Sequence, residues 1–311
     1  MASNSLLKRN AKRRLWQRNL PLILLALPGF IYLILFNYLP MFGVVIAFKD
    51  YSYIKGILGS DWAGFKHFEF FFTSNDAVVV IRNSILYQLW FHIIGTVCSI
   101  IVALLLYNIN SRRALKVYQT TIIIPYFISW VLVAYIGFAL FSNRFGILNS
   151  VITALGGTGV DWYAEPAYWP VILTLFFIWK GTGMSCIIYY ATLMGIDSSL
   201  FEAAKIDGAG RLRCIWHVAL PALIPIICIN SILAIGSIMG GDFGLFYQVP
   251  RNSGALYPVT DIINTYVYRG LQAGNMSQTA AVGLFQSVVG CVLVFLTNTT
   301  IRKVSPENAM F

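Results

Sequence analysis

The chain has 311 residues, of which 58% are hydrophobic and only 11% are charged, and its net charge is +10. A soluble domain typically carries about a quarter charged residues, because its surface faces water. Here the apolar residues occur in runs of about twenty or more, long enough to cross roughly 30 Å of hydrocarbon as helices. A membrane barrel would instead show alternating strands of about ten residues. The composition therefore excludes a soluble globular protein and predicts an all-α integral membrane protein.

A basic cluster precedes the first apolar run. It consists of Lys8, Arg9, Lys12, Arg13, Arg14 and Arg18. Such a cluster holds the start of a helix at the cytoplasmic face, beside anionic lipid headgroups. We therefore expect residues 1–19 to be a cytoplasmic segment that meets membrane lipid, not nucleic acid. The apolar run that follows is longer than the core of a usual signal peptide and has no clear cleavage site, so it is predicted to stay as an anchor.

Six membrane-spanning helices are predicted, in one domain over residues 20–304 with a cytoplasmic tail of 305–311. They lie near 21–46, 82–107, 117–141, 168–194, 214–240 and 279–301. If the N-terminus is inside, the cytoplasmic parts hold 14 of the 22 basic residues, whereas the longer outer segments hold six. This bias predicts that both termini are cytoplasmic.

The connection between the fourth and fifth spans is patterned as a short helix. Ser199 is the expected N-cap, and Glu202 stands three residues later, as in a capping box. Ala203 and Ala204 are good helix formers, and Gly208 is expected to end the helix. So much order in a cytoplasmic loop indicates a surface on which another protein packs.

This loop resembles the EAA loop of ATP-binding-cassette importer permeases. The family pattern is E-A-A, three residues, G, nine residues and I-x-L-P. Here it is met by Glu202-Ala203-Ala204, by Gly208, and by Val218-Ala219-Leu220-Pro221, with Val218 in place of isoleucine. The resemblance implies the type I importer permease fold, in which the loop over about 197–221 forms a cytoplasmic coupling helix that docks on an ATPase subunit. It implies this role for Ser199, Glu202, Ala203, Ala204, Asp207 and Gly208.

Further stretches are similar to the MalF-like and LplB-like carbohydrate permeases of this family. They are Phe48–Tyr51, Asn83-Ser84, Gln119, Ile124–Trp130, Trp179–Gly181, Asp261–Arg269 and Ala281–Phe285. The resemblance implies import of sugars or oligosaccharides by alternating access in a bacterial plasma membrane. It also implies a second homologous permease, two ATPase subunits and an extracellular solute-binding protein. Because the chain has no G-x-x-x-x-G-K-[ST] motif, we expect it to be no enzyme and to bind no cofactor, with ATP and Mg on the partner subunits.

The substrate path has six candidate residues, whose roles the sequence leaves open. They are Trp179, Lys180, Gly181, Asn230, Ser237 and Asp242. A lysine inside a span costs roughly 2.5–3.5 kcal/mol on insertion scales, so Lys180 should face a cavity or a partner. In one interpretation it contacts the sugar; in the other it bonds to backbone carbonyls or snorkels to the interface. Trp179 either stacks on a sugar or packs, and Asn230 is expected to bond across helices.

Two smaller expectations concern the outer half of the chain. Gly236 and Gly240 form a G-x-x-x-G step that is expected to permit close helix approach. The segment from Asp261 to Arg269 is expected to be a short helix beneath the docked binding protein.

Three alternative functions remain open at this point. A secondary transporter would usually show buried acids or two repeats with broken helices, and the predicted span interiors hold no Asp or Glu. A membrane enzyme would need a nucleophile, an acid/base pair or a metal cluster. The histidines and cysteines lack metal spacing, so we predict no catalytic or metal site. The same importer with a peptide, phosphate or amino acid as cargo is opposed only by the carbohydrate-like stretches.

Overall fold

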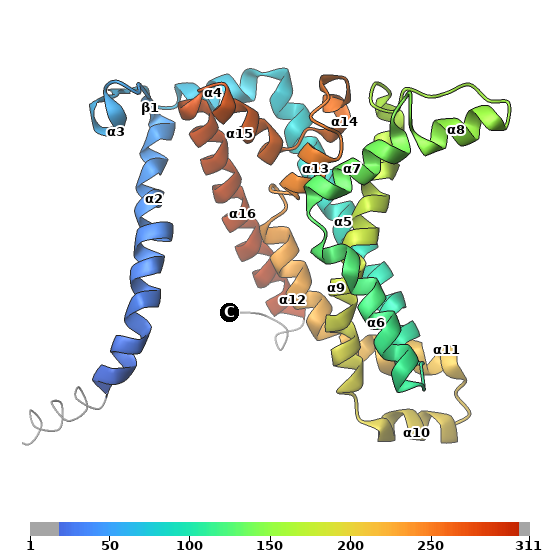
Figure 1. Cartoon of the computed structure of the whole chain (residues 1–311). Helices are drawn as coiled ribbons and strands as arrows, with labels where there is room; N and C mark the ends of the chain where they lie inside the picture. Colours follow the sequence, from blue (N-terminus) through green and yellow to red (C-terminus); the bar gives the residue numbers. More distant parts are fainter. Residues whose placement is uncertain (1–18, 305–311) are drawn as a thin grey trace, which may run out of the picture.

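The computed structural model describes residues 19–304, and it is helical almost throughout (Figure 1). Helices long and apolar enough to cross a membrane are Asn19–Phe48, Asn75–Tyr107, Pro166–Met194, Arg211–Gly236 and Met276–Lys303. A sixth crossing is supplied by a bent pair, α6 (Arg112–Phe127) and α7 (Trp130–Phe141). The predicted six-helix architecture is confirmed, with one span broken. The predicted terminal segments lie outside the described residues, Asn19 excepted.

The elements follow the chain in this order. The first span contains η1 (Ile34–Tyr38), α2 (Leu39–Met41) and η2 (Phe42–Phe48), and then come β1 (Lys49–Asp50), α3 (Gly56–Gly59), β2 (Asp61–Trp62), α4 (Lys66–Thr73), α5 (Asn75–Tyr107), α6, α7 and α8 (Ile147–Ala154). Next are η3 (Pro166–Tyr168), α9 (Trp169–Met194), α10 (Ser198–Ile206), α11 (Arg211–Cys214), η4 (Ile215–Ala219) and α12 (Leu220–Gly236). The chain closes with α13 (Phe243–Gln248), η5 (Gly254–Leu256), α14 (Tyr257–Thr260), α15 (Ile263–Gln272) and α16 (Met276–Val304).

The bundle has two distinct ends (Figure 1). Short elements, among them α3, α4, α8, α14 and α15, gather at one end, which we call the cap end. The isolated helix α10 marks the opposite end, called here the α10 end. The two strands of the cap end pair antiparallel, with Lys49 opposite Trp62.

The first span stands apart from the other helices (Figure 1). No part of its most apolar window is buried, and it packs on α16 only near the cap end, through η2. A helix that is apolar on all sides must be surrounded by lipid or by another membrane protein. The first span therefore presents a long surface that the rest of this chain does not cover.

The third span is predicted as one helix over 117–141, and this prediction is wrong. The chain bends by 94° between α6 and α7. Pro125, near the end of α6, lacks a backbone donor and so weakens its last turn. Ser129 then starts α7 as its N-cap, because its hydroxyl accepts the N–H of Leu132 (3.4 Å).

The fifth span also differs from its prediction, since α12 ends at Gly236 and a turn follows. Gly236 does permit close approach, but its partner lies on α16. A Cβ added to Gly290 would stand 2.7 Å from the carbonyl oxygen of Gly236. Gly240 lies beyond the helix, so Gly236 and Gly240 do not form one packing step.

The backbones of α6 and α9 touch at Gly183, where an added Cβ would overlap the carbonyl oxygen of Ile122. Gly181, two residues earlier, faces open space. We expect Gly183→Ala to destabilise the protein by roughly 1–3 kcal/mol through overpacking. Its matched control, Gly181→Ala, should be neutral or stabilising by up to about 1 kcal/mol, because Ala favours helix. Thermal unfolding in detergent micelles checks this, and equal midpoints for the two variants would contradict the contact.

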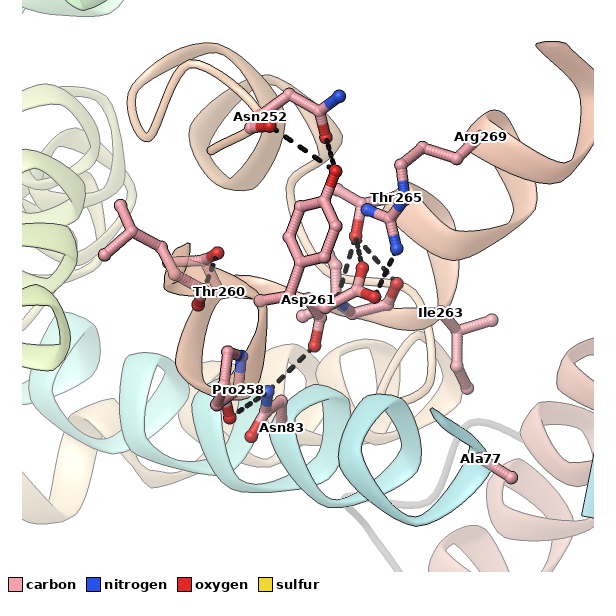
Figure 2. A network of polar contacts seen from close by, with 12 residues as sticks. Ala77, Asn83, Asn252, Pro258, Thr260, Asp261, Ile263, Thr265 and Arg269 are labelled. Atoms are coloured by element: carbon pink, nitrogen blue, oxygen red, sulfur yellow. Dashed lines mark hydrogen bonds and ion pairs between the residues drawn. The ribbon is translucent and has the colours of Figure 1, made fainter. Parts of the chain in front are cut away.

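A buried carboxylate organises the cap end (Figure 2). Asp261 is 5% exposed and accepts hydrogen bonds from the Thr265 hydroxyl (2.5 Å) and the Arg269 guanidinium. The Thr265 hydroxyl also accepts the N–H of Ile262 (2.9 Å). The Arg269 guanidinium stacks on the Tyr257 ring, 4.1 Å from its centroid. These contacts hold α14 against the start of α15.

The same network reaches across to α5 (Figure 2). Asn83 donates to the carbonyl oxygens of Asp261 (2.9 Å) and Pro258 (3.2 Å). The neighbouring Ser84 hydroxyl accepts the N–H of Ile263 (2.9 Å). The expected short helix over 261–269 is present as α15, displaced by two residues at its start. Two family-like stretches that are far apart in the chain are therefore parts of one contact.

Candidate functional site

The helix α10 extends below the bundle and has little contact with it (Figure 1). Phe201 turns inward and lies 5.8 Å from the ring of Tyr107 at the end of α5. Outward-facing positions include apolar side chains, such as Leu200 and the 87% exposed Ile206. Exposed apolar side chains on an ordered helix mark an interaction surface, for a protein or for a membrane.

The start of α10 differs from its prediction. The N-cap is Asp197, not Ser199, and its carboxylate accepts the N–H of Ser199 (2.9 Å). This bond lowers the pKa of Asp197, because it stabilises the ionised form. The predicted capping box is therefore wrong. It requires the Glu202 side chain to accept the N–H of Ser199, and that N–H already donates to Asp197. Glu202 is exposed on the surface of α10.

The end of α10 follows its prediction. Gly208 has a φ of +76°, in the left-handed region. Its N–H donates to the carbonyl oxygen of Lys205 (3.0 Å), and the N–H of Ala209 donates to that of Ala204 (2.9 Å). This pair of bonds is a Schellman motif, with Asp207 as the C-cap and glycine at the position that favours it. The six residues predicted for coupling thus lie together on or beside one exposed helix.

Lys180, a residue of α9, forms hydrogen bonds to the broken third span. Its ammonium donates to the carbonyl oxygens of Tyr126 (2.6 Å) and Ile128 (2.6 Å), with a longer contact to that of Pro125 (3.4 Å). The Pro125 carbonyl also accepts the N–H of Ile128 (3.2 Å), whereas Tyr126 and Ile128 lie where α6 ends and its last carbonyls need other donors. Three carbonyl oxygens lie within reach of the three donors of the ammonium, as the backbone interpretation of Lys180 expects, and contact with a sugar stays a prediction.

The other side of the break is held by α13. Trp130, the first residue of α7, packs on the backbone of Gly244, where an added Cβ would overlap the indole ring. Asp242 caps α13 by accepting the N–H of Leu245 (3.2 Å) and interacts with Trp130 and Lys180. The Lys180 ammonium also lies 5.1 Å from the centroid of the Trp130 ring. Lys180 and Asp242, predicted as separate path residues, therefore both lie beside the break, Lys180 on α9 and Asp242 at the start of α13.

Aromatic rings are exposed around this break. Tyr126 is 46% exposed and Phe127 is 77% exposed, and Trp179 on α9 is 43% exposed. Gly181 adds no side chain and faces open space. The site therefore presents exposed aromatic faces at a break in the third span, while Lys180 and Asp242 bond to the backbone on its two sides.

The remaining two path candidates lie elsewhere. Asn230 donates to the hydroxyl of Tyr189 (3.3 Å), so the expected bond across helices is present. Asn230 and Tyr189 both line a cavity of about 230 Å³ among α5, α9 and α12. Ser237 donates to the carbonyl oxygens of Leu233 and Ala234 at the end of α12. Neither residue reaches the break.

Two groups of residues were missed from the sequence. Tyr126, Phe127 and Trp130 were noticed only for their family resemblance, although the neighbouring proline and Ser129 signal a helix end within an apolar run. A polar face on α5 was also missed: Gln88, His92, Thr96 and Ser99 line the Asn230 cavity. Their spacing of three or four residues places them on one side of a helix.

Comparison with known families identifies the chain. The family model of the inner membrane component of binding-protein-dependent transport systems matches residues 95–305, about two thirds of the chain. The match includes the break, α9 and α10. The chain belongs to this family. It is a permease component of an ATP-binding-cassette importer, and the family consists of transport components rather than enzymes.

Individual relatives support the same assignment. The chain is 40% identical to the polygalacturonan/rhamnogalacturonan transport system permease protein YteP of Bacillus subtilis (strain 168), covering 92% of this chain and 89% of YteP. It is 37% identical to protein LplB of the same organism, covering 92% and 90%. A solved bacterial alginate ABC transporter, in complex with alginate pentasaccharide-bound periplasmic protein, contains a similar chain. Its TM-score is 0.84 at 30% identity, over 94% of this chain and 98% of that one. The predicted type I permease fold is confirmed.

Proposed function

We propose that this permease imports oligosaccharides by alternating access, as one half of a channel whose ATP is hydrolysed on separate subunits. The observation that carries the proposal is the broken third span, whose backbone carbonyls are bonded to Lys180 of α9 and whose Tyr126 and Phe127 rings are exposed. Aromatic faces offer apolar contact to the C–H faces of sugar rings. The end of α9 leads directly into α10. The same helix therefore contacts the proposed cargo surface and connects it to the proposed docking helix.

The cargo class rests on this surface together with the relatives. YteP is named for polygalacturonan and rhamnogalacturonan, and the similar solved structure for alginate. These cargoes are carbohydrate chains, which supports an oligosaccharide over a peptide, phosphate or amino acid.

The partners follow from three surfaces. Exposed α10 serves to dock one of two ATPase subunits, which would hold ATP and Mg. The uncovered first span serves to contact a second, homologous permease and lipid. The cap end serves to receive the extracellular solute-binding protein. Basic residues of the α10 end, such as Arg112, Arg113, Lys205 and Arg211, support a cytoplasmic α10 end and hence cytoplasmic termini.

The test is purification of the complex from native membranes in mild detergent, with a charge reversal on α10. We expect wild type to bring down a second permease and a nucleotide-binding chain. Glu202→Lys should lose most of the nucleotide-binding chain, because it reverses an exposed charge on the proposed docking helix. Glu165→Lys, which reverses an exposed acid before η3, should retain it.

Mass spectrometry of the purified samples gives the result. A chain that purifies alone or as a homodimer from several detergents would sink the importer proposal for this protein. Equal retention of the nucleotide-binding chain by both variants would instead remove Glu202 from the docking surface.

A further inference from the structure

A small cavity beside the break has a different chemistry from the rest of the site. It measures about 240 Å³ and lies between α7 and the end of α13, lined by Tyr135, Tyr247, Gln248, Arg251 and Asn252 with two apolar residues of α7. No lining residue is an acid, and Arg251 is the only base among them. One apolar lining residue, Val131, directly follows Trp130, so the cavity starts one residue after the first residue of α7.

The backbone places Arg251 by an unusual turn. Arg251 and Asn252 have φ values of 57° and 49°, the non-glycine residues with positive φ in the described chain. Such conformations cost roughly 1–2 kcal/mol each and persist only where surrounding contacts hold them. Here the N–H of Asn252 donates to the carbonyl oxygen of Tyr247 (3.1 Å), and the Tyr257 hydroxyl donates to the Asn252 side chain (3.1 Å).

The guanidinium of Arg251 is oriented but not neutralised. It lies over the Phe138 ring, 4.2 Å from the ring centroid. Within residues 19–304, the ion pairs join Asp50, Asp61 and Asp261 to other bases and do not involve Arg251. Contact with a ring leaves the in-plane N–H donors of a guanidinium free, and these donors match a carboxylate with two parallel hydrogen bonds.

We propose that this cavity binds one acidic sugar residue of the oligosaccharide, with its carboxylate on Arg251 and its ring beside Tyr135 or Tyr247. This inference rests on the proposed function and adds the charge of the cargo to it. The volume is below the roughly 300–1,000 Å³ of drug-sized ligand pockets, so it suits one residue of a longer chain. Tyr135 is 64% exposed, which leaves its face available. The similar alginate transporter carries an acidic polysaccharide.

The experiment measures uptake by the complete complex in proteoliposomes, with one binding protein for every variant. The probes are tri-galacturonate, tri-mannuronate and their neutral methyl esters. We expect Arg251→Gln to raise KM for the acids roughly tenfold or more, since a charge-assisted bond is lost, and to change KM for the esters less than about twofold. Arg251→Lys, which keeps the charge, should lie between. Arg144→Gln removes an exposed arginine of the outer loop and should match wild type.

Each other outcome decides against the inference. If Arg251→Gln and Arg251→Lys slow both acids and esters equally, Arg251 is structural. If wild type imports neutral oligosaccharides but neither acid, the cavity does not select acidic sugar, although the proposed function stands. If no ATPase co-purifies with the chain and neither the acids nor the esters are imported, the proposed function is wrong, and the inference that rests on it is wrong as well.

Discussion

Gly208→Val is expected to reduce transport at least tenfold while leaving the chain in the membrane. Gly208 closes α10 at a φ of +76°, and a β-branched residue is a genuine outlier in the left-handed region. The cost is roughly 1–2 kcal/mol or more. This is enough to unwind the last turn of α10 and to break the hydrogen bonds that close it at the carbonyl oxygens of Lys205 and Ala204. The docking surface for the ATPase would then lose its shape, although the spans do not depend on it.

Uptake in proteoliposomes and co-purification of the nucleotide-binding chain measure this effect. Gly208→Asn is the matched control, because asparagine tolerates the left-handed conformation, and it should retain most of the transport. If both variants lose transport equally, transport depends on the absence of a side chain at position 208, not on the left-handed conformation of its backbone. Normal transport in Gly208→Val would remove the coupling role of this turn.

Asp261→Ala is expected to destabilise the protein by roughly 3–5 kcal/mol. Removing one partner of a buried charge pair leaves the other uncompensated, here the guanidinium of Arg269. The Thr265 hydroxyl also loses its bond to Asp261 and keeps only the Ile262 carbonyl oxygen as acceptor (2.8 Å), so the contact between α14 and α15 weakens (Figure 2). The thermal midpoint of the purified complex in detergent checks the loss.

An exposed ion pair in the same cap end serves as the control. Asp61 pairs with Lys55 at 2.6 Å, but their side chains are 75% and 50% exposed. Exposed pairs typically contribute about 0–1 kcal/mol, so Asp61→Ala should shift the midpoint little. Similar shifts for Asp61→Ala and Asp261→Ala would show that burial does not decide the contribution of these carboxylates.

The coupling loop shows how far local sequence can lead. Its helix, its glycine stop at Gly208 and its exposure are as predicted, because hydrogen bonds between near neighbours produce them. The start was misplaced by two residues, since Asp197 and Ser199 are both favoured N-caps and only the folded geometry selects between them. Docking of Glu202 on an ATPase stays a prediction.

The break of the third span was beyond the same reasoning. Hydropathy averages over a window, and the apolar residues on both sides of Ser129 appear as one span. At a bend, the carbonyl oxygens at the helix end need other donors, and here Lys180 supplies them from about 50 residues later in the chain. The sequence showed a charge inside a span, but not which atoms would receive it.

The sequence by itself determined the membrane class, the span count and the coupling motif, because each depends on residues that are neighbours along the chain. The tertiary structure alone decided that Lys180 and Asp242 both lie beside the break, that Asn230 and Ser237 lie elsewhere, and that Arg251 lines a cavity with Tyr135. Those arrangements depend on which helices pack together, and the packing is determined by contacts such as that of Gly183 with Ile122, which no local pattern records.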